Sequence, residues 1–242
     1  MRMGRLPMVV ATLMAGGLVS GCKQDAPAEP VTTISTEPSA PVAKPSASET
    51  AGEELTVLAF GDSLFAGYGL SDPGRLSYPA KLEAALDAKG RNVRMVNAGV
   101  SGDTTAAGRQ RLAFTLDSQK TKPDLAILEL GGNDLLRGLP PEQTRANLAA
   151  MLDTFRQRGI PVVLFGLEAP PNYGPKWQEQ FDAVYGSLAR EYDVPLVPFV
   201  TEAVFARPIL LQADRVHPTA EGVDQLVSLT ADRIAAALPD RD

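Results

Sequence analysis

The sequence has few of the residues on which several protein classes depend. Cys22 is its only cysteine, so the rest of the chain can hold neither a disulfide, nor a cysteine metal cluster, nor a catalytic thiol. His217 is its only histidine. Lysine and arginine (23) are outnumbered by aspartate and glutamate (29), which gives a net charge of −6. Without a basic excess, no nucleic acid partner is expected.

The first 22 residues have the pattern of an export signal. Arginines 2 and 5 precede the apolar run PMVVATLMAGGLV, which is too short for a comfortable spanning helix and leads into small residues. The string LVSGC (18–22) resembles the lipobox of bacterial lipoproteins, in which cleavage leaves the cysteine as an acylated N-terminus. The alternative is a conventional cleavage site beside an ordinary Cys22. Acylation predicts a protein held on a membrane without a spanning segment, and Lys23 favours the outer membrane.

Residues 23–54 contain five prolines and no aromatic residue. Such a segment cannot bury enough apolar surface to offset the entropy lost on ordering, so we predict a disordered, extended tether. A poorly packed extra subdomain is the alternative. The expected domain organisation is a lipoprotein signal peptide at 1–22, a tether at 23–54 and one folded domain at 55–242.

Short apolar runs alternate with amphipathic helical patterns from residue 55 onward. Regular alternation of strand and helix indicates right-handed crossovers and an α/β fold, in which a five-stranded parallel sheet is covered by helices on both faces. The expected strands are 55–61, 92–98, 124–131, 160–167 and 195–200, and the expected helices are 78–89, 105–119, 142–158, 176–192 and 219–237.

Polar and glycine-rich residues follow the first three expected strands. They are GDS (61–63), GVSGDT (99–104) and GGND (131–134). Ligands of such sheets bind outside the carboxyl ends of the strands, so these three segments are expected to share one edge. Their convergence predicts the position of a site.

A serine, a histidine and an aspartate are the candidate catalytic residues. Ser63 lies at a sharp turn from strand to helix, where its alternative role is a helix cap. His217 could take the proton of that serine and return it, although a lone histidine is more often structural. Asp214, three residues before His217, could orient the imidazole, or could simply be a turn or cap carboxylate.

The developing oxyanion of such a reaction needs hydrogen-bond donors. The candidates are the N–H of Gly102, the side-chain amide of Asn133 and the N–H of Ser63. Gly99 competes with Gly102, which is preferred because it lies further beyond the strand end. A turn with positive φ is the alternative role of the glycine, and a cap or Asx turn that of the asparagine. Asp134 is expected to brace its own loop.

The residues that line an acyl pocket can be proposed only from their positions in the sequence relative to the expected strands and the candidate catalytic residues. Candidate walls are APPNYGPKWQ (169–178), FARPILLQ (205–212), Leu135 and Leu136. Ordinary packing of these aromatic and aliphatic side chains is an equal alternative.

Four ordered blocks resemble those of the SGNH (GDSL-type) hydrolases: GDSL with Ser63, NAGVSGDT with Gly102, GGND with Asn133, and DRVH with Asp214 and His217. The chain is most similar to the branch of bacterial acyl-CoA thioesterase I, arylesterase and lysophospholipase. The resemblance covers essentially all of 55–238. Phe65 departs from the small polar residue of the thioesterase, so the substrate range of that enzyme is not carried over.

The resemblance implies a three-layer, flavodoxin-like fold and a Ser63–His217–Asp214 triad with an oxyanion hole from Ser63, Gly102 and Asn133. It also implies hydrolysis of short- to medium-chain acyl esters or thioesters through an acyl-enzyme, without metal or organic cofactor. We expect a monomeric hydrolase on the periplasmic side of the bacterial envelope. A carbohydrate O-deacetylase and a non-catalytic, anchored binding module are the alternatives.

Overall fold

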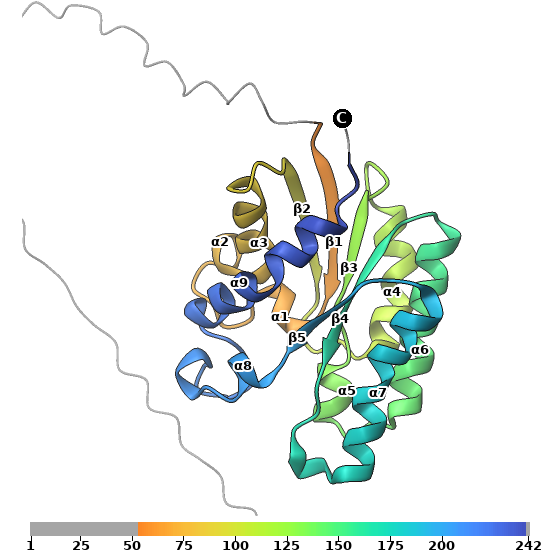
Figure 1. Cartoon of the computed structure of the whole chain (residues 1–242), viewed down its shortest axis with the longest axis vertical. Helices are drawn as coiled ribbons and strands as arrows, with labels where there is room; N and C mark the ends of the chain where they lie inside the picture. Colours follow the sequence, from red (N-terminus) through yellow and green to blue (C-terminus); the bar gives the residue numbers. More distant parts are fainter. Residues whose placement is uncertain (1–52, 241–242) are drawn as a thin grey trace, which may run out of the picture. The chain divides into compact units, whose positions relative to one another are not determined.

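The first strand of the sheet is β1 (Leu55–Gly61), all seven residues of which are buried. In the computed structural model, which describes residues 53–240, five parallel strands lie in the order β2-β1-β3-β4-β5 (Figure 1). The order reverses at β1, which has β2 on one side and β3 on the other. This is the predicted five-stranded α/β architecture.

Each strand is followed by at least one helix, as the alternating pattern predicts. The strands that accompany β1 are β2 (Val93–Gly99), β3 (Leu125–Leu128), β4 (Val162–Leu167) and β5 (Leu196–Val200). The long helices are α3 (Tyr78–Asp87), α4 (Thr105–Asp117), α6 (Pro141–Gln157), α7 (Pro175–Tyr192) and α9 (Ala220–Ala237). The short ones are α1 (Ser63–Ala66), α2 (Pro73–Leu76), α5 (Gly132–Leu136), α8 (Glu202–Phe205), and the 3-10 turns η1 (Pro171–Tyr173) and η2 (Pro208–Leu210).

Helices cover both faces of the sheet. In Figure 1, α3 and α9 lie together on one face, and α4, α6 and α7 lie on the other. Alternate residues of β1 belong to two separate apolar cores: Val57 and Ala59 pack on the α3/α9 side, Leu58 and Phe60 on the α4/α6/α7 side. Burial on both faces is why the sequences of β1, β3 and β4 are almost continuously apolar rather than alternating.

The predicted strand and helix positions are confirmed to within a few residues, except at β3. The expected strand at 124–131 is shorter, because pairing stops at Leu128. The N–H of the next residue, Glu129, still donates to the carbonyl of Phe60 in β1 at 2.9 Å, and the chain then leads through Leu130 into the site. The four short helices were not predicted, because four or five residues carry too little periodicity to be recognised.

The carboxyl ends of the strands form one edge of the sheet. Gly61 at the end of β1 is in register with Gly99 at the end of β2, and Phe60 is in register with Leu128 of β3. The short helices α1 and α5 begin at this edge. Among residues 53–240, no helix is both long enough and apolar enough to cross a membrane.

The predicted signal peptide (1–22), with Cys22, lies outside the described residues, as does the predicted tether apart from its last two residues. At that boundary, Glu54 forms an ion pair with Arg94 of β2, with 3.0 Å between Oε1 and Nε. The ordered strand β1 begins one residue later, where the folded domain was expected to start.

Candidate active site

Ser63 is the first residue of α1 and directly follows the turn at the end of β1. The cap of this helix is Asp62, whose Oδ1 accepts a hydrogen bond from the N–H of Leu64 at 3.0 Å. Ser63 is therefore not the capping residue, and its hydroxyl remains free for another partner. The Ser63 side chain lines a pocket at the carboxyl edge of the sheet.

The loop that carries the histidine is closed by an antiparallel bridge between Leu211 and Pro218. Within it, the N–H of Gln212 donates to the carbonyl of His217 at 2.7 Å. Arg215 has a φ of 60°, a left-handed conformation that is uncommon for residues other than glycine. This tight loop brings the Asp214 carboxylate back to the ring of His217.

The structure brings the three candidate catalytic side chains together in one chain of hydrogen bonds. His217 Nε2 lies 2.8 Å from Ser63 Oγ, and His217 Nδ1 lies 2.7 Å from Asp214 Oδ2. The other oxygen, Asp214 Oδ1, accepts the N–H groups of Val216 and His217, each at 3.0 Å. The Asp214 carboxylate therefore shapes the loop and also orients the imidazole.

The electrostatics of Asp214 fit an ionised partner for the imidazole. Partial burial alone would raise the pKa of Asp214. The hydrogen bonds from the N–H and ring of His217 and from the N–H of Val216 outweigh it and lower the pKa to about 2. Tyr68 covers the His217 ring from outside, with 4.5 Å between the ring centroids. The imidazole is thus held on three sides.

Gly99 and Gly102 have different roles in this structure. The N–H of Gly99 is bonded to Oδ1 of Asn97 at 2.9 Å, and a Cβ on Gly99 would lie 2.4 Å from the N atom of Ala66. Gly99 is thus needed for the close approach of β2 to α1. Gly102 has a φ of 86°, and its N–H donates no hydrogen bond to any described residue. These contacts favour Gly102 over Gly99 as an oxyanion donor.

Asn133 lies on α5 and lines the same pocket as Ser63. Its Nδ2 donates one hydrogen bond to Oδ2 of Asp62 at 3.0 Å. Because an amide nitrogen has two N–H groups, one remains for a ligand. The helix N-cap is Gly131, so the alternative role of Asn133 as a cap is excluded.

Asp134 braces the loop, as predicted, and joins it to two helices. Its carboxylate accepts the N–H of Thr105 at 2.8 Å, the Thr105 hydroxyl and the hydroxyl of Thr144 at 3.2 Å. The start of α4 and the first turn of α6 are thereby fixed to the segment that carries Asn133.

The pocket beside Ser63 has a volume of roughly 410 Å³ and is mainly apolar. Several of the predicted wall residues contribute to it, among them Leu135, Leu136, Ala169 and Phe205. Charged residues also reach it, and they are mostly acidic: Asp62, Glu168, Asp182 and Glu202, with Arg215 as the cation. An apolar acyl chain bound next to Ser63 would fit this lining.

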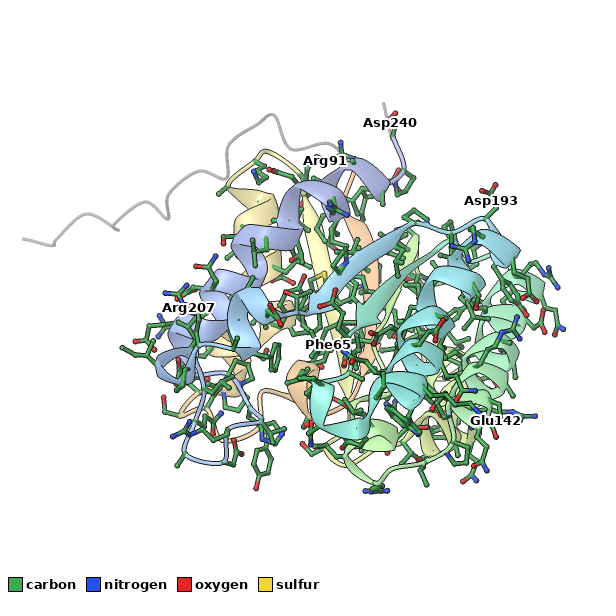
Figure 2. The ribbon with its side chains drawn as sticks, turned by 60° about the horizontal axis from the view of Figure 1, so that its bottom comes forward. Phe65, Arg91, Glu142, Asp193, Arg207 and Asp240 are labelled. Carbon is green, nitrogen blue, oxygen red and sulfur yellow. The ribbon has the colours of Figure 1, made fainter. Side chains whose placement is uncertain are left out.

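Two aromatic residues singled out in the sequence lie elsewhere. Trp177 does not line the pocket; it stacks between Tyr173 and Phe181, with centroid distances of 4.7 and 5.2 Å. Phe65 is fully buried and stacks on Tyr78 at 5.3 Å, and Figure 2 shows it toward the middle of the molecule. In the same way, only Phe205 and Ala206 of the segment 205–212 line the pocket.

Sequence reasoning missed two buried acids next to the site, Asp62 and Glu129. Asp62 is 2% exposed and Glu129 is 0% exposed. A glutamate inside the otherwise apolar stretch AILELGG (126–132) is the signal that could have found the second. Within residues 53–240, no group of three or more His, Cys, Asp or Glu side chains is placed to hold a metal ion.

A hydrogen-bonded serine, histidine and aspartate at the carboxyl edge of a parallel sheet is the arrangement of a serine hydrolase. Comparison with known proteins gives the family. A profile described as "GDSL-like Lipase/Acylhydrolase family" matches residues 59–225, and this chain belongs to that family.

Curated relatives and solved structures agree with this assignment. The chain is 44% identical to "Esterase TesA" of Pseudomonas aeruginosa over 163 residues, which cover 67% of this chain and 79% of that protein. It is 38% identical to "Arylesterase" of Vibrio mimicus over 193 residues, 80% of this chain and 94% of that one. The structure of AlinE4, described as an SGNH-hydrolase family esterase, matches with a TM-score of 0.65 and 60% identity over 78% of this chain and 99% of that one.

Proposed function

We propose that this protein is a serine hydrolase that cleaves short- to medium-chain acyl esters or thioesters. The observation that carries the proposal is the pair of contacts that His217 makes, with Ser63 on one ring nitrogen and Asp214 on the other. Relatives named esterase, arylesterase and "Thioesterase 1/protease 1/lysophospholipase L1", the last from Escherichia coli at 40% identity, support the same class of reaction.

In the first half of the reaction, Ser63 Oγ attacks the acyl carbonyl and its proton passes to His217 Nε2. The negative oxygen of the tetrahedral intermediate binds the N–H groups of Ser63 and Gly102 and the free N–H of Asn133. When the intermediate collapses, the alcohol or thiol leaves with the proton from His217. Asp214 keeps the imidazole oriented and stabilises its charged form.

In the second half, water attacks the acyl-enzyme and gives a proton to His217. The second intermediate then releases the carboxylic acid, and the proton on His217 returns to Ser63 Oγ. All groups that move protons belong to the chain. None of these steps requires a metal ion or an organic cofactor.

The apolar lining of the pocket favours an acyl chain over a sugar as the group next to Ser63. Each methylene buried there is worth about 0.8 kcal/mol, or about a fourfold gain in kcat/KM per CH₂ until the pocket is filled. Acyl p-nitrophenyl esters of increasing length would show this gain, and matched thioesters would give the ester preference. A protein that cleaves only acetylated saccharides would instead be an O-deacetylase.

The role of Ser63 is tested by Ser63→Ala. Turnover of a p-nitrophenyl ester should fall to the low residual rate that the oxyanion donors and substrate binding support without the nucleophile. A fluorophosphonate should no longer label the protein. Ser187→Ala is a matched control, because the Ser187 hydroxyl bonds only within α7, to the carbonyl of Val184. Wild-type turnover in the Ser63 variant would refute the mechanism. Failure of a fluorophosphonate to label the folded wild type would favour a binding module.

The same proposal includes a location at the bacterial cell envelope, on the periplasmic side, through lipidation of Cys22. Its support is the sequence LVSGC with its preceding apolar run. Metabolic labelling with a radioactive fatty acid should mark the wild type but not Cys22→Ser. Separation of the two membranes would then locate the anchored protein, with the outer membrane as the expected fraction.

A further inference from the structure

Two buried carboxyl groups lie next to the nucleophile turn, and the proposed reaction uses neither. The N–H of Asp62 donates to Oε2 of Glu129 at 3.3 Å, which joins the turn after β1 to the end of β3. Both side chains are buried. Carboxyl groups are almost never fully buried without a partner, so the state of this pair needs a physical account.

Glu129 has the surroundings of a neutral carboxylic acid. Among the described residues, its Oε1 is the one buried side-chain oxygen or nitrogen without a hydrogen-bond partner, and none of their ion pairs includes Glu129. An ionised carboxylate in this position would lose its hydration without compensation, whereas the protonated group avoids most of that cost. Burial, and next the charge of Asp62, raise the pKa of Glu129 well above its usual value.

Asp62 has the surroundings of a carboxylate. Its Oδ1 accepts the N–H of Leu64 and its Oδ2 accepts Nδ2 of Asn133, each at 3.0 Å. Burial raises the pKa of Asp62 to about 6, while those two hydrogen bonds, the charge of His217 and the side chain of Glu129 limit the rise. At neutral pH, Asp62 is therefore ionised and Glu129 keeps the one proton of the pair.

Tyr185 of α7 is a further titratable group whose electrostatic surroundings include Glu129. Its hydroxyl donates to the carbonyl of Leu130 at 3.0 Å. Burial, together with the charges of the acids around it, raises the pKa of Tyr185 well above its usual value, so this group stays neutral. It does not compete for the proton between Glu129 and Asp62.

We propose that Glu129 is a positioning residue: its neutral carboxyl group holds the Asp62 turn by accepting the N–H of Asp62. The Asp62 carboxylate in turn fixes the Asn133 amide, so that the second N–H of that amide faces the oxyanion. The inference rests on the proposed hydrolase function. Through its bond to Leu64, the same carboxylate also sets the start of α1, which carries Ser63. A neutral Glu129 also keeps a second negative charge away from the developing oxyanion.

A double-mutant cycle on kcat tests this role. Glu129→Leu removes the acceptor of the Asp62 N–H at similar size. It should lower kcat about tenfold or more, up to the roughly 10²- to 10³-fold loss expected for one oxyanion donor, with KM little changed. In an Asn133→Ala background the same substitution should have a clearly smaller effect, limited to what reaches Ser63 through Leu64. An equal loss in both backgrounds, or no loss in either, would overturn the proposal.

The conservative variant Glu129→Gln keeps a neutral side chain with an acceptor oxygen and should retain kcat within about threefold of the wild type. A loss as large as that of Glu129→Leu would overturn the proposal. Leu86→Ala, on the α3 side of the core, controls for lost stability alone. It should lower the unfolding free energy and leave the kcat of the folded enzyme unchanged.

A direct measurement does not depend on any variant folding well. Carbon-13 labelling of the glutamate carboxyl groups should show one protonated glutamate in the wild type at pH 7 that is absent from Glu129→Gln. An ionised Glu129 at pH 7 would overturn the proposal. This measurement does not require turnover, so it separates failure of the inference from failure of the Ser63 mechanism.

Discussion

At the scale of single residues, Asp214 shows how one side chain serves both a loop and a reaction. One of its oxygens accepts two backbone N–H groups and the other accepts the imidazole. The backbone bonds fix the position of the carboxylate before a substrate arrives. The imidazole is then oriented by a group that is itself rigid, which is the condition for efficient proton transfer.

Asp214→Asn should therefore lower kcat strongly without unfolding the protein. The amide can still accept backbone N–H groups, but it no longer stabilises the charged imidazole. We expect a loss in kcat on the order of 10³- to 10⁴-fold, with KM little changed. Asp72→Asn is the control, because the Asp72 side chain makes no capping hydrogen bond at the start of α2. A loss of less than tenfold would show that Asp214 does not orient His217.

Contacts in the structure decide between the roles that the sequence left open for Ser63 and His217. Ser63 was open to a capping role, and the structure gives that role to Asp62. His217 was open to a structural role, yet both of its ring nitrogens face the other two members of the triad. For Trp177, a pocket wall and ordinary packing were both open, and the structure shows packing, because the residue lies in the first turn of α7 and stacks between Tyr173 and Phe181.

At the scale of elements, the serine and the histidine lie on segments 154 residues apart, so their separation depends on how two loops are joined. Gln212 makes that junction. Its Nε2 donates to the carbonyl of Tyr68, in the loop after α1, at 2.8 Å and to the carbonyl of Pro218 at 2.9 Å. The side-chain amide of Gln212 therefore connects the loop after Ser63 to the segment that follows His217.

Gln212→Leu should loosen this junction. Loss of two hydrogen bonds at a half-exposed site should lower the unfolding free energy by about 1–2 kcal/mol. It should also lower kcat by about tenfold, because Ser63 and His217 would no longer be held at bonding distance. Urea unfolding and steady-state kinetics measure the two effects. Gln225→Leu, on the exposed face of α9, is the control and should change neither. An unchanged kcat in the Gln212 variant would show that the bridge is not needed.

At the scale of the whole molecule, the buried acids make stability depend on pH in an unusual direction. The ordinary pKa of glutamate is 4.5, and that of Glu129 is raised well above it in the folded protein. Above pH 4.5 the folded state therefore binds more protons than the unfolded state, and stability falls as pH rises toward the folded pKa. Asp62, raised to about 6, adds a loss of the same sign between about pH 4 and 6.

Glu129→Gln removes the larger of these two contributions. The gain in unfolding free energy relative to the wild type should be close to zero near pH 4 and should grow by about 1.4 kcal/mol per pH unit above about pH 4.5. Chemical denaturation of both proteins between pH 4 and 7 measures the slope. A difference that does not change with pH would mean that Glu129 is ionised in the folded protein.

Much of the fold and of the site follows from the sequence by itself. The apolar runs and helical periodicity determine the order of strands and helices, because a parallel sheet buried on both faces needs continuous apolar strands joined by helices. The lone histidine, the serine after the first strand and the acid three residues before that histidine determine the candidate triad.

Only the tertiary structure decided what surrounds these residues. Glu129 is an acid in an apolar stretch until the pairing of β1 with β3 brings it beside Asp62. Phe65 belongs to the core rather than to the pocket because its ring packs against Tyr78 of α3. Such contacts depend on strand order, on strand register and on which side of each loop a helix covers. These features arise from packing between distant segments and cannot be read from the local sequence.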